Sequence, residues 1–409
     1  MPRETPVLGL SERWSLARSN VASPITVIYH ATLPANLITQ DQLKDAASRL
    51  NARDRLTLLI DHIICDGLGA RNLFSDLLSI LSDQPIPQQP EGLPARMDDT
   101  VELQPSGNNA TAQSKIQSTI KSLSNGINTI VSPESVYTNC PTLQSPGYNS
   151  ITASQQFSHF SLSPSELSSL IAEGKKHNVP TIHPVIHIAS IVALYRALQS
   201  TSGYSFFTSI PISERNAALG HPRSTGNYVT FHFSTDRISH STKFWDQVRD
   251  FSATLRQPET KITARHTLGK LAAINGEEEL DENAPSKWED YLYNVMSDSN
   301  GPHKLSLAVS NVGLADLPTL GKLAGQVEDV YFQQAASAMG GCAVLSIMST
   351  RGGALTCSIS SKIGSMPPGV FESFAQRIKP ILQAIARGDI SEDATAGGAI
   401  PGVLDVGNT

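Results

Sequence analysis

The chain has 409 residues, which is too long for one ordinary hydrophobic core, so we expect two domains of roughly 150 to 200 residues each. Hydrophobic residues make up 40% of the chain and charged residues 17%, which is the composition of a globular protein. The net charge of −6 argues against a nucleic-acid-binding protein, because binding to the phosphate backbone needs clustered Lys and Arg.

The cysteines and the apolar segments bear on metal content and location. Cys65, Cys140, Cys342 and Cys357 are isolated, so the sequence indicates neither a zinc site nor a disulfide framework. The N-terminus lacks the apolar stretch of a secretion signal, and no run approaches the roughly 18 apolar residues of a membrane span. We therefore expect a cytoplasmic protein that contacts no membrane.

The first part of the chain alternates between predicted strands and helices. Residues 25–33 alternate and are rich in β-branched residues, which predicts a strand. A helix with a capping box is predicted over 39–50. Residues 55–64 form an apolar strand, and the leucine spacing over 68–81 predicts a helix of about four turns.

Two segments rich in Pro, Ser and Asn, 84–113 and 132–155, read as irregular connections on either side of a predicted helix at 114–130. We expect the first lobe to end near residue 155.

The second part is more regular. A strand at 157–163 leads into a helix at 164–176, where Ser163, Pro164 and Glu166 combine an N-cap, a first-turn proline and a capping box. Residues 181–199 read as a buried helix. The remaining predicted elements are strands at 204–213, 227–236, 304–313, 326–334, 343–352 and 353–361 and helices at 244–257 and 368–387, followed by a frayed tail.

The segment DHIICDG at 61–67 is the clearest chemical signal. It places His62 at the end of an apolar strand, directly before a glycine and a helix. Histidine suits general-base catalysis because its ordinary pKa lies near neutrality. Asp66 is four residues on and is expected to fix the corner and aim the imidazole. The alternative is a histidine of purely structural role at a strand end, with Asp66 capping the next helix.

This segment resembles the HxxxDG motif of the acyltransferase superfamily that includes chloramphenicol acetyltransferase, the BAHD acyltransferases, alcohol acyltransferases and the condensation domains of peptide synthetases. The chain looks most similar to the alcohol O-acyltransferases of secondary metabolism. Further stretches of the family stand in the expected order: ISER at 212–215 with GNYV at 226–229, SLAVSNVG at 306–313, and ALTCSISS with the helix after it at 354–382. Only HxxxDG is specific by itself.

The resemblance implies an α/β fold of the chloramphenicol acetyltransferase type. Mixed sheets flanked by helices would form two lobes, with an active-site tunnel between them. The first lobe, 1–155, would hold HxxxDG, and the second would span 156–409. The implied reaction moves an acyl group from acyl-CoA to a hydroxyl or amine of a small, largely apolar metabolite. It needs no metal and no cofactor beyond the co-substrate acyl-CoA, although an acyl carrier protein is an alternative donor. A monomer is expected.

The resemblance also implies roles for single residues. His62 would be the general base, and Asp66 would hold the corner by pairing with an arginine, for which Arg215 is the candidate. Gly67 would permit the turn and leave room for the acyl carbonyl.

Ser310 and Asn311 would line the channel and hydrogen-bond to the donor or the tetrahedral intermediate. Their alternative is ordinary polarity at a strand end.

Three departures from the family leave other functions open. Asp61 stands where many members have a second histidine, and ASAMGG at 336–341 replaces DFGWG. The motif also comes unusually early in the chain, so the first lobe looks shortened relative to the family. A cyclase or pericyclase that uses the same tunnel without CoA, or a non-catalytic binding protein, are the alternatives. His183 and His187 have the i, i+4 spacing of metal ligands, but no Glu follows His183, so we expect them to be structural.

Overall fold

A computed structural model describes residues 10–21, 26–34, 53–86, 95–103, 137–139, 148–199, 203–215, 223, 225–274, 287–296, 303, 305–317, 321, 323–337 and 340–400. The predicted helices at 39–50 and 114–130 lie outside these residues.

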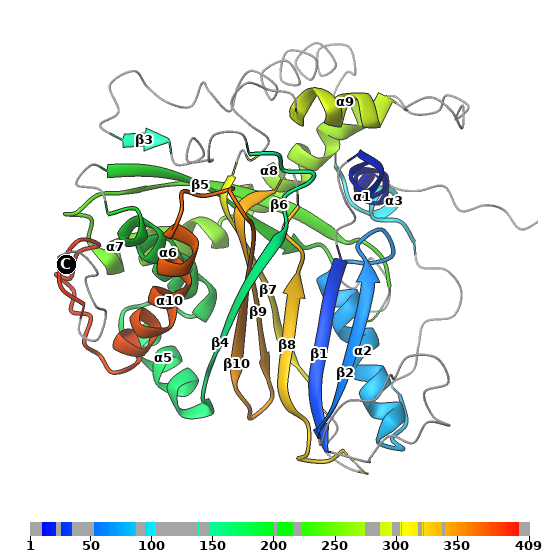
Figure 1. Cartoon of the computed structure of the whole chain (residues 1–409), viewed down its shortest axis with the longest axis horizontal. Helices are drawn as coiled ribbons and strands as arrows, with labels where there is room; N and C mark the ends of the chain where they lie inside the picture. The colour runs from blue at the N-terminus through cyan, green and yellow to red at the C-terminus, as the bar shows by residue number, and fades with distance from the viewer. Residues whose placement is uncertain are drawn as a thin grey trace, which may run out of the picture.

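The described strands form two sheets, which stand side by side in Figure 1. One has the order β2-β1-β8, with antiparallel pairing throughout. The other is mixed and has the order β3-β5-β7-β9-β10-β4, with β6 also paired to β5. The strands are β1 (Thr26–Pro34), β2 (Arg53–Asp61), β3 (Tyr137–Asn139), β4 (Gln155–Leu162), β5 (Gly203–Ser213), β6 (Val229–Ile238), β7 (Leu305–Ala315), β8 (Glu328–Gln334), β9 (Gly341–Thr350) and β10 (Leu355–Lys362).

Helices cover one side of each sheet. The helix α2 lies behind the smaller sheet, and α5, α6, α7 and α10 gather on the larger one (Figure 1). The helices are α1 (Leu10–Val21), α2 (Gly67–Leu81), α3 (Met97–Thr100), α5 (Pro164–Lys176), α6 (Ile182–Ala197), α7 (Phe244–Arg256), α8 (Pro258–Gly269), α9 (Lys287–Met296) and α10 (Val370–Ala386), with the 3₁₀ helix η3 (Lys270–Ala273). None of the described helices is long and apolar enough to cross a bilayer.

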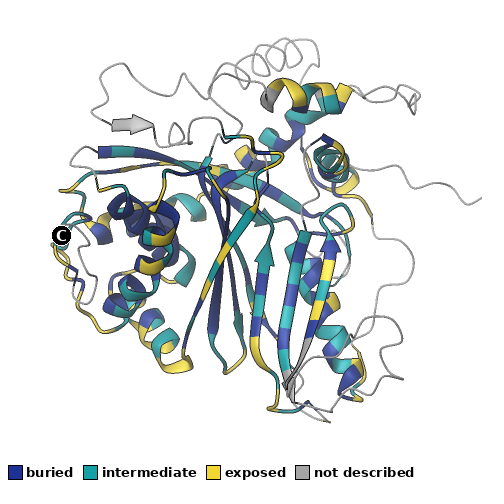
Figure 2. Cartoon of the chain, viewed as in Figure 1, coloured by how far each residue is buried: buried dark blue, intermediate teal, exposed yellow. Residues whose placement is uncertain are grey.

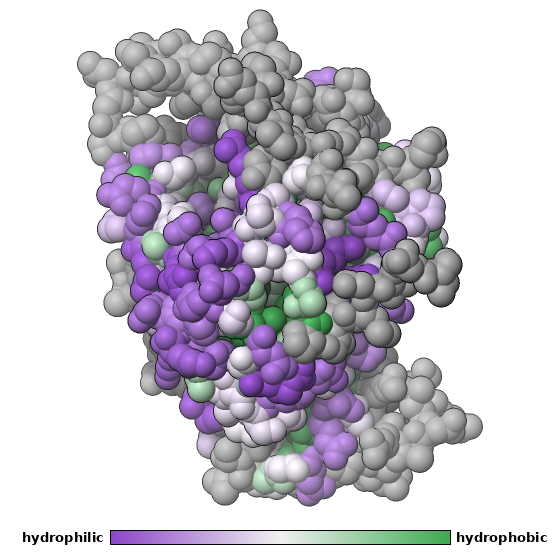
Figure 3. Space-filling view, turned by 90° about the vertical axis from the view of Figure 1, so that its left-hand side faces the viewer, coloured by the Kyte–Doolittle hydropathy of each residue, from purple (hydrophilic) through white to green (hydrophobic). Residues whose placement is uncertain are grey.

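The larger core surrounds α6. Every residue of this helix from Pro184 to Ala197 is buried, which Figure 2 shows as a dark blue helix between the sheet and α10. A helix that is apolar on all sides is stable only where other elements cover it completely, as the sequence predicted for this segment. The side of the molecule on which α7 and α10 lie is mostly hydrophilic where it is described (Figure 3).

The smaller core joins α2 to its sheet through aromatic side chains. Tyr29 of β1 is fully buried and stacks on Phe74 of α2 and on Phe332 of β8, with ring centroids 5.5 and 5.1 Å apart. The strand β8 comes from the second half of the chain but pairs with β1. Membership of the sheets therefore does not follow a single cut in the sequence, and the domain boundary near residue 155 stays a prediction.

The predicted strands and helices in the described residues are confirmed, including the capping box of Ser163 and Glu166. The helices α1, α8 and α9 were not predicted from the sequence. The short elements α3 and β3 lie in segments for which the sequence predicted irregular chain.

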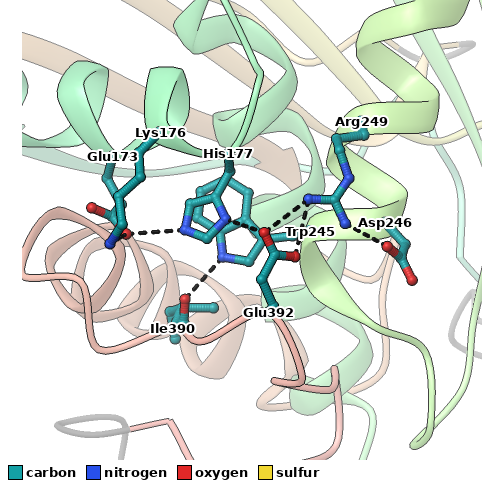
Figure 4. Close-up of polar contacts among 8 residues, drawn as sticks. All are labelled: Glu173, Lys176, His177, Trp245, Asp246, Arg249, Ile390 and Glu392. Carbon is teal, nitrogen blue, oxygen red and sulfur yellow. Dashed lines mark hydrogen bonds and ion pairs between the residues drawn. The ribbon is translucent and has the colours of Figure 1, made fainter.

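The prediction of a frayed tail is wrong for residues 387–400. Figure 4 shows how this segment is fixed: Trp245 Nε1 donates to the Ile390 carbonyl at 2.9 Å, and His177 Nδ1 lies 2.6 Å from a Glu392 oxygen. Arg249 also bonds Glu392, and the His177 ring stacks on Trp245 with centroids 3.9 Å apart. The tail lacks a helical or strand period, so the sequence did not reveal that single side chains anchor it.

Candidate active site

The corner after β2 is a tight turn fixed by Asp61. The Asp61 carbonyl accepts from Ile64 N at 3.0 Å, and its carboxylate accepts from Ile63 N at 2.9 Å. His62 is therefore the first residue beyond the strand, and α2 begins five residues later at Gly67. Since the Asp61 carboxylate closes the turn, its role here is structural.

Asp66 is the N-cap of α2 and is fully buried. One carboxylate oxygen accepts from Gly69 N at 2.9 Å, which satisfies a free N–H of the first helical turn. The other accepts from Arg215 Nη1 at 2.5 Å and from Tyr228 N at 2.9 Å. Both oxygens are thus used within the protein, and they join the corner to residues at the ends of β5 and β6.

Arg215 reaches Asp66 through space that Gly69 leaves open. A Cβ at Gly69 would lie 3.2 Å from Arg215 Nη2 and 2.9 Å from the Cys65 Cβ. Nη2 also donates to the Gly226 carbonyl at 3.1 Å, and the guanidinium lies over the Tyr228 ring, 5.0 Å from its centroid. The structure therefore brings together the predicted pair, Asp66 and Arg215, as a buried ion pair.

Asn227 holds the backbone of His62 directly. Its amide nitrogen donates to the His62 carbonyl at 2.8 Å and to the Ile63 carbonyl at 3.1 Å. The backbone N–H of Asn227 points to Glu12 of α1, whose Oε1 lies 3.3 Å away. The segment 226–229 carries the family resemblance, but no local sequence pattern predicts that the Asn227 amide contacts the backbone of His62.

The His62 side chain is half-buried, and its Nδ1 is sealed from solvent and has no hydrogen-bond partner in the described part of the chain. Burial lowers the pKa of His62 below its ordinary value, and the nearby charge of Arg18 adds to this effect. Asp66, the His62 carbonyl and Asn227 act in the opposite direction and do not outweigh the burial. A lowered pKa keeps the imidazole neutral at neutral pH, which is the form that can accept a proton.

Comparison with known proteins agrees with this geometry. The sequence profile of the alcohol acetyltransferase family matches residues 42–366, which is most of the chain. The chain belongs to the alcohol acetyltransferase family. No curated protein matches its sequence.

Solved structures share the fold of this acetyltransferase family member at low sequence identity. The trichothecene 15-O-acetyltransferase TRI3 from Fusarium sporotrichioides is similar over 93% of this chain and 94% of its own, with a TM-score of 0.63 and 12% identity. Polyketide synthase associated protein 5 from Mycobacterium tuberculosis is similar over 92% and 97%, with a TM-score of 0.55 and 17% identity. The condensation domain of the Monacolin K polyketide synthase MokA is similar over 95% and 98%, with a TM-score of 0.55 and 12% identity.

These comparisons confirm the predicted α/β fold of the chloramphenicol acetyltransferase type and the predicted superfamily. The family match supports acyltransferase activity. The tunnel between the lobes stays a prediction.

In this family member, Gly67 makes room for β7. A Cβ at Gly67 would lie 2.9 Å from Val312 Cγ1 and 3.4 Å from the Phe332 ring. The Tyr29 hydroxyl also donates to the Gly67 carbonyl at 2.7 Å. The missing side chain therefore serves close packing between α2 and the strands, and the predicted room for an acyl carbonyl at Gly67 stays a prediction.

Ser310 and Asn311 lie on β7, directly before Val312, the residue that packs against Gly67 at the start of α2. Both side chains are half-buried. The Asn311 amide oxygen accepts from Gly313 N at 2.8 Å, at an irregularity in the pairing with β9. This bond fixes the strand locally, and the predicted contact of Ser310 and Asn311 with a substrate stays a prediction.

His183 and His187 lie on α6 in the larger core, whereas Cys65 lies in the corner itself, directly before Asp66. His187 is fully buried, and its Nε2 lies 3.3 Å from an Asp236 oxygen. Within the described ranges, no group of His, Cys, Asp or Glu has the arrangement of a metal site. Cys65, Cys342 and Cys357 are free thiols, and Cys140 lies outside the described residues.

Proposed function

We propose that this chain transfers an acyl group from acyl-CoA to a hydroxyl, or an amine, of a small and largely apolar metabolite, with His62 as the general base. The observation on which the proposal rests is an imidazole on a corner held by buried bonds, where burial lowers its pKa. The Asp66–Arg215 ion pair and the Asn227 amide fix this corner, although Arg215 and Asn227 are far from it in the sequence. Such preorganisation is what a base must have to meet a substrate proton.

In the proposed reaction, His62 Nε2 takes the proton of the acceptor as its oxygen attacks the thioester carbonyl. The tetrahedral intermediate then collapses, the C–S bond breaks, and the departing CoA thiolate receives that proton. Base catalysis of this kind supplies roughly 10²- to 10⁴-fold, and positioning of the two substrates supplies most of the remainder. Ser310 and Asn311 are proposed to line the donor side. Neither a metal nor a resident cofactor takes part.

The proposed partners are the two substrates of the reaction. The protein acts as a cytoplasmic monomer on two small molecules and needs no nucleic acid or membrane. A thioester on an acyl carrier protein is the alternative donor.

The test is His62→Ala, assayed by release of free CoA thiol from acetyl-CoA with a panel of alcohols. We expect a loss of roughly 10²- to 10⁴-fold in kcat with an unchanged thermal unfolding temperature. The control is His159→Ala, because His159 is an exposed histidine on β4. Turnover by the His62 variant equal to that of the control would refute the base assignment.

A cyclase or pericyclase without CoA is the second candidate, and the segment ASAMGG at 336–341 favours it, since this segment stands where BAHD enzymes have DFGWG. A thermal shift with CoA separates the two: stabilisation by acetyl-CoA supports acyl transfer, and its absence supports the cyclase. A non-catalytic binding protein is the third candidate. The presence of His62, Asp66 and Gly67 together speaks against this candidate, because a protein that only binds does not need the complete motif.

A further inference from the structure

The helix α1 lies against the corner that bears His62. Figure 1 shows this helix above the ends of β1 and β2, beside α8 and α9. Its Glu12 accepts from the backbone of Asn227, which in turn holds the His62 carbonyl. On its other side, α1 packs on α9 through a cluster of apolar and aromatic residues: Ala17, Val21, Trp288 and Leu292, with Trp14 and Tyr291 beside them.

Arg18 of α1 is half-buried, and among the residues that the structure describes it forms no ion pair. Its Nε is sealed from solvent and has no hydrogen-bond partner among these residues. The guanidinium carbon lies 5.8 Å from the centroid of the Trp14 ring. Burial lowers the pKa of Arg18 to about 10, so the group is still charged at neutral pH.

The charge of Arg18 is close enough to His62 to lower the pKa of the imidazole. A cation whose donor is sealed from solvent, as Arg18 Nε is, is costly unless an anion pairs with it. A guanidinium presents a planar fork of N–H donors that matches the two oxygens of a carboxylate. In the same contact between α1 and α9, Trp288 Nε1 is a second buried donor, and no described residue accepts from it.

We propose that Arg18 binds a carboxylate that one of the two substrates carries close to its reacting atoms. The phosphates of CoA do not fit this role, because the long pantetheine arm separates them from the thioester beside His62. The carboxylate therefore belongs to the acceptor or to the acyl group. The proposal deepens the proposed acyl transfer and rests on it for the reaction, but binding of the anion can be measured without turnover.

The first experiment titrates His62 by NMR of the histidine ring protons, assigned by their loss in His62→Ala. Butyrate is the probe, and 1-butanol is its uncharged match. We expect saturating butyrate to raise the pKa of His62 in the wild-type protein, because it neutralises the charge of Arg18, whereas butanol has no effect. In Arg18→Gln the pKa is already raised and butyrate no longer changes it. Arg18→Lys keeps a weaker response to butyrate.

The control is Arg256→Gln, which removes an exposed charge from α7 and should leave the butyrate response intact. An equal response in Arg18→Gln, or none in the wild-type protein, would overturn the proposal. A structural role for Arg18 would give a changed His62 pKa without any response to butyrate, and this result also overturns it.

The second experiment identifies which substrate carries the carboxylate. With a neutral alcohol, kcat/KM is compared for malonyl-CoA and propionyl-CoA; with acetyl-CoA, it is compared for 3-hydroxybutyrate and 2-butanol. We expect one carboxylated substrate to be preferred, and Arg18→Gln to remove about 10- to 100-fold of that preference. A preference that survives in Arg18→Gln refutes the proposal. If no pair is turned over while butyrate still acts through Arg18, acyl transfer fails and the anion site stands.

Discussion

Replacing Asp66 by Asn isolates the buried ion pair that joins the His62 corner to the end of β5. Asn caps a helix as well as Asp does, so the bond to Gly69 N survives the change. What is lost is the charge that faces Arg215. The side chains of Asp66 and Arg215 are 1% and 6% exposed, so solvent does not screen the loss. Breaking a buried pair in this way costs about 3–5 kcal/mol of the free energy of unfolding, because the remaining cation stays buried and unpaired.

The assay is urea denaturation of the wild-type protein, Asp66→Asn, Arg215→Met and the double variant. If the cost arises from the unpaired partner, the double variant should be no less stable than either single one, with a coupling energy of at least about 2 kcal/mol. The control cycle uses Arg351 and Asp316, an ion pair whose side chains are 67% and 71% exposed. Exposed pairs of this kind contribute about 0–1 kcal/mol. The reasoning would be refuted if the losses of stability in Asp66→Asn and Arg215→Met add up to that of the double variant within about 0.5 kcal/mol.

Three further predictions concern the corner. Asn227→Ala removes both bonds to the carbonyls after β2, so we expect kcat to fall by about tenfold, which corresponds to about 1.4 kcal/mol for the two lost bonds together, while KM changes little; an effect on KM alone would contradict this. Gly69→Ala forces a Cβ to within 2.9 Å of the Cys65 Cβ, so thermal unfolding should show a loss of about 1–3 kcal/mol, and unchanged stability would mean that the corner has room to spare. The pKa of His62 is lowered from 6.5, and the neutral form is the active one, so kcat/KM should fall only when the pH drops below that value; a profile that falls above pH 7 would show that another group is limiting.

The sequence by itself determined the local parts of the structure. The alternation of β1, the apolar strand before His62, the helix from Gly67 to Leu81 and the capping box at Ser163 all follow from residues within a few positions of one another. A cap or a period of 3.6 residues works through neighbours in the chain, so it can be read without knowing the fold. The wholly buried α6 was predictable for the same reason, because its polar residues are too few to form a solvent face.

Only the tertiary structure decided how the candidate site is assembled. Asn227 and His62 are 165 positions apart, and Arg215 and Asp66 are 149 apart. The family resemblance suggested the second pair, but no pattern in the sequence suggested the first or the influence of the Arg18 charge on the pKa of His62. Contacts of this kind depend on which strands pair and how α1 packs on its neighbours, as when β8 crosses to the sheet of β1. Packing of elements far apart in the chain fixes them, and local propensity contains no record of it.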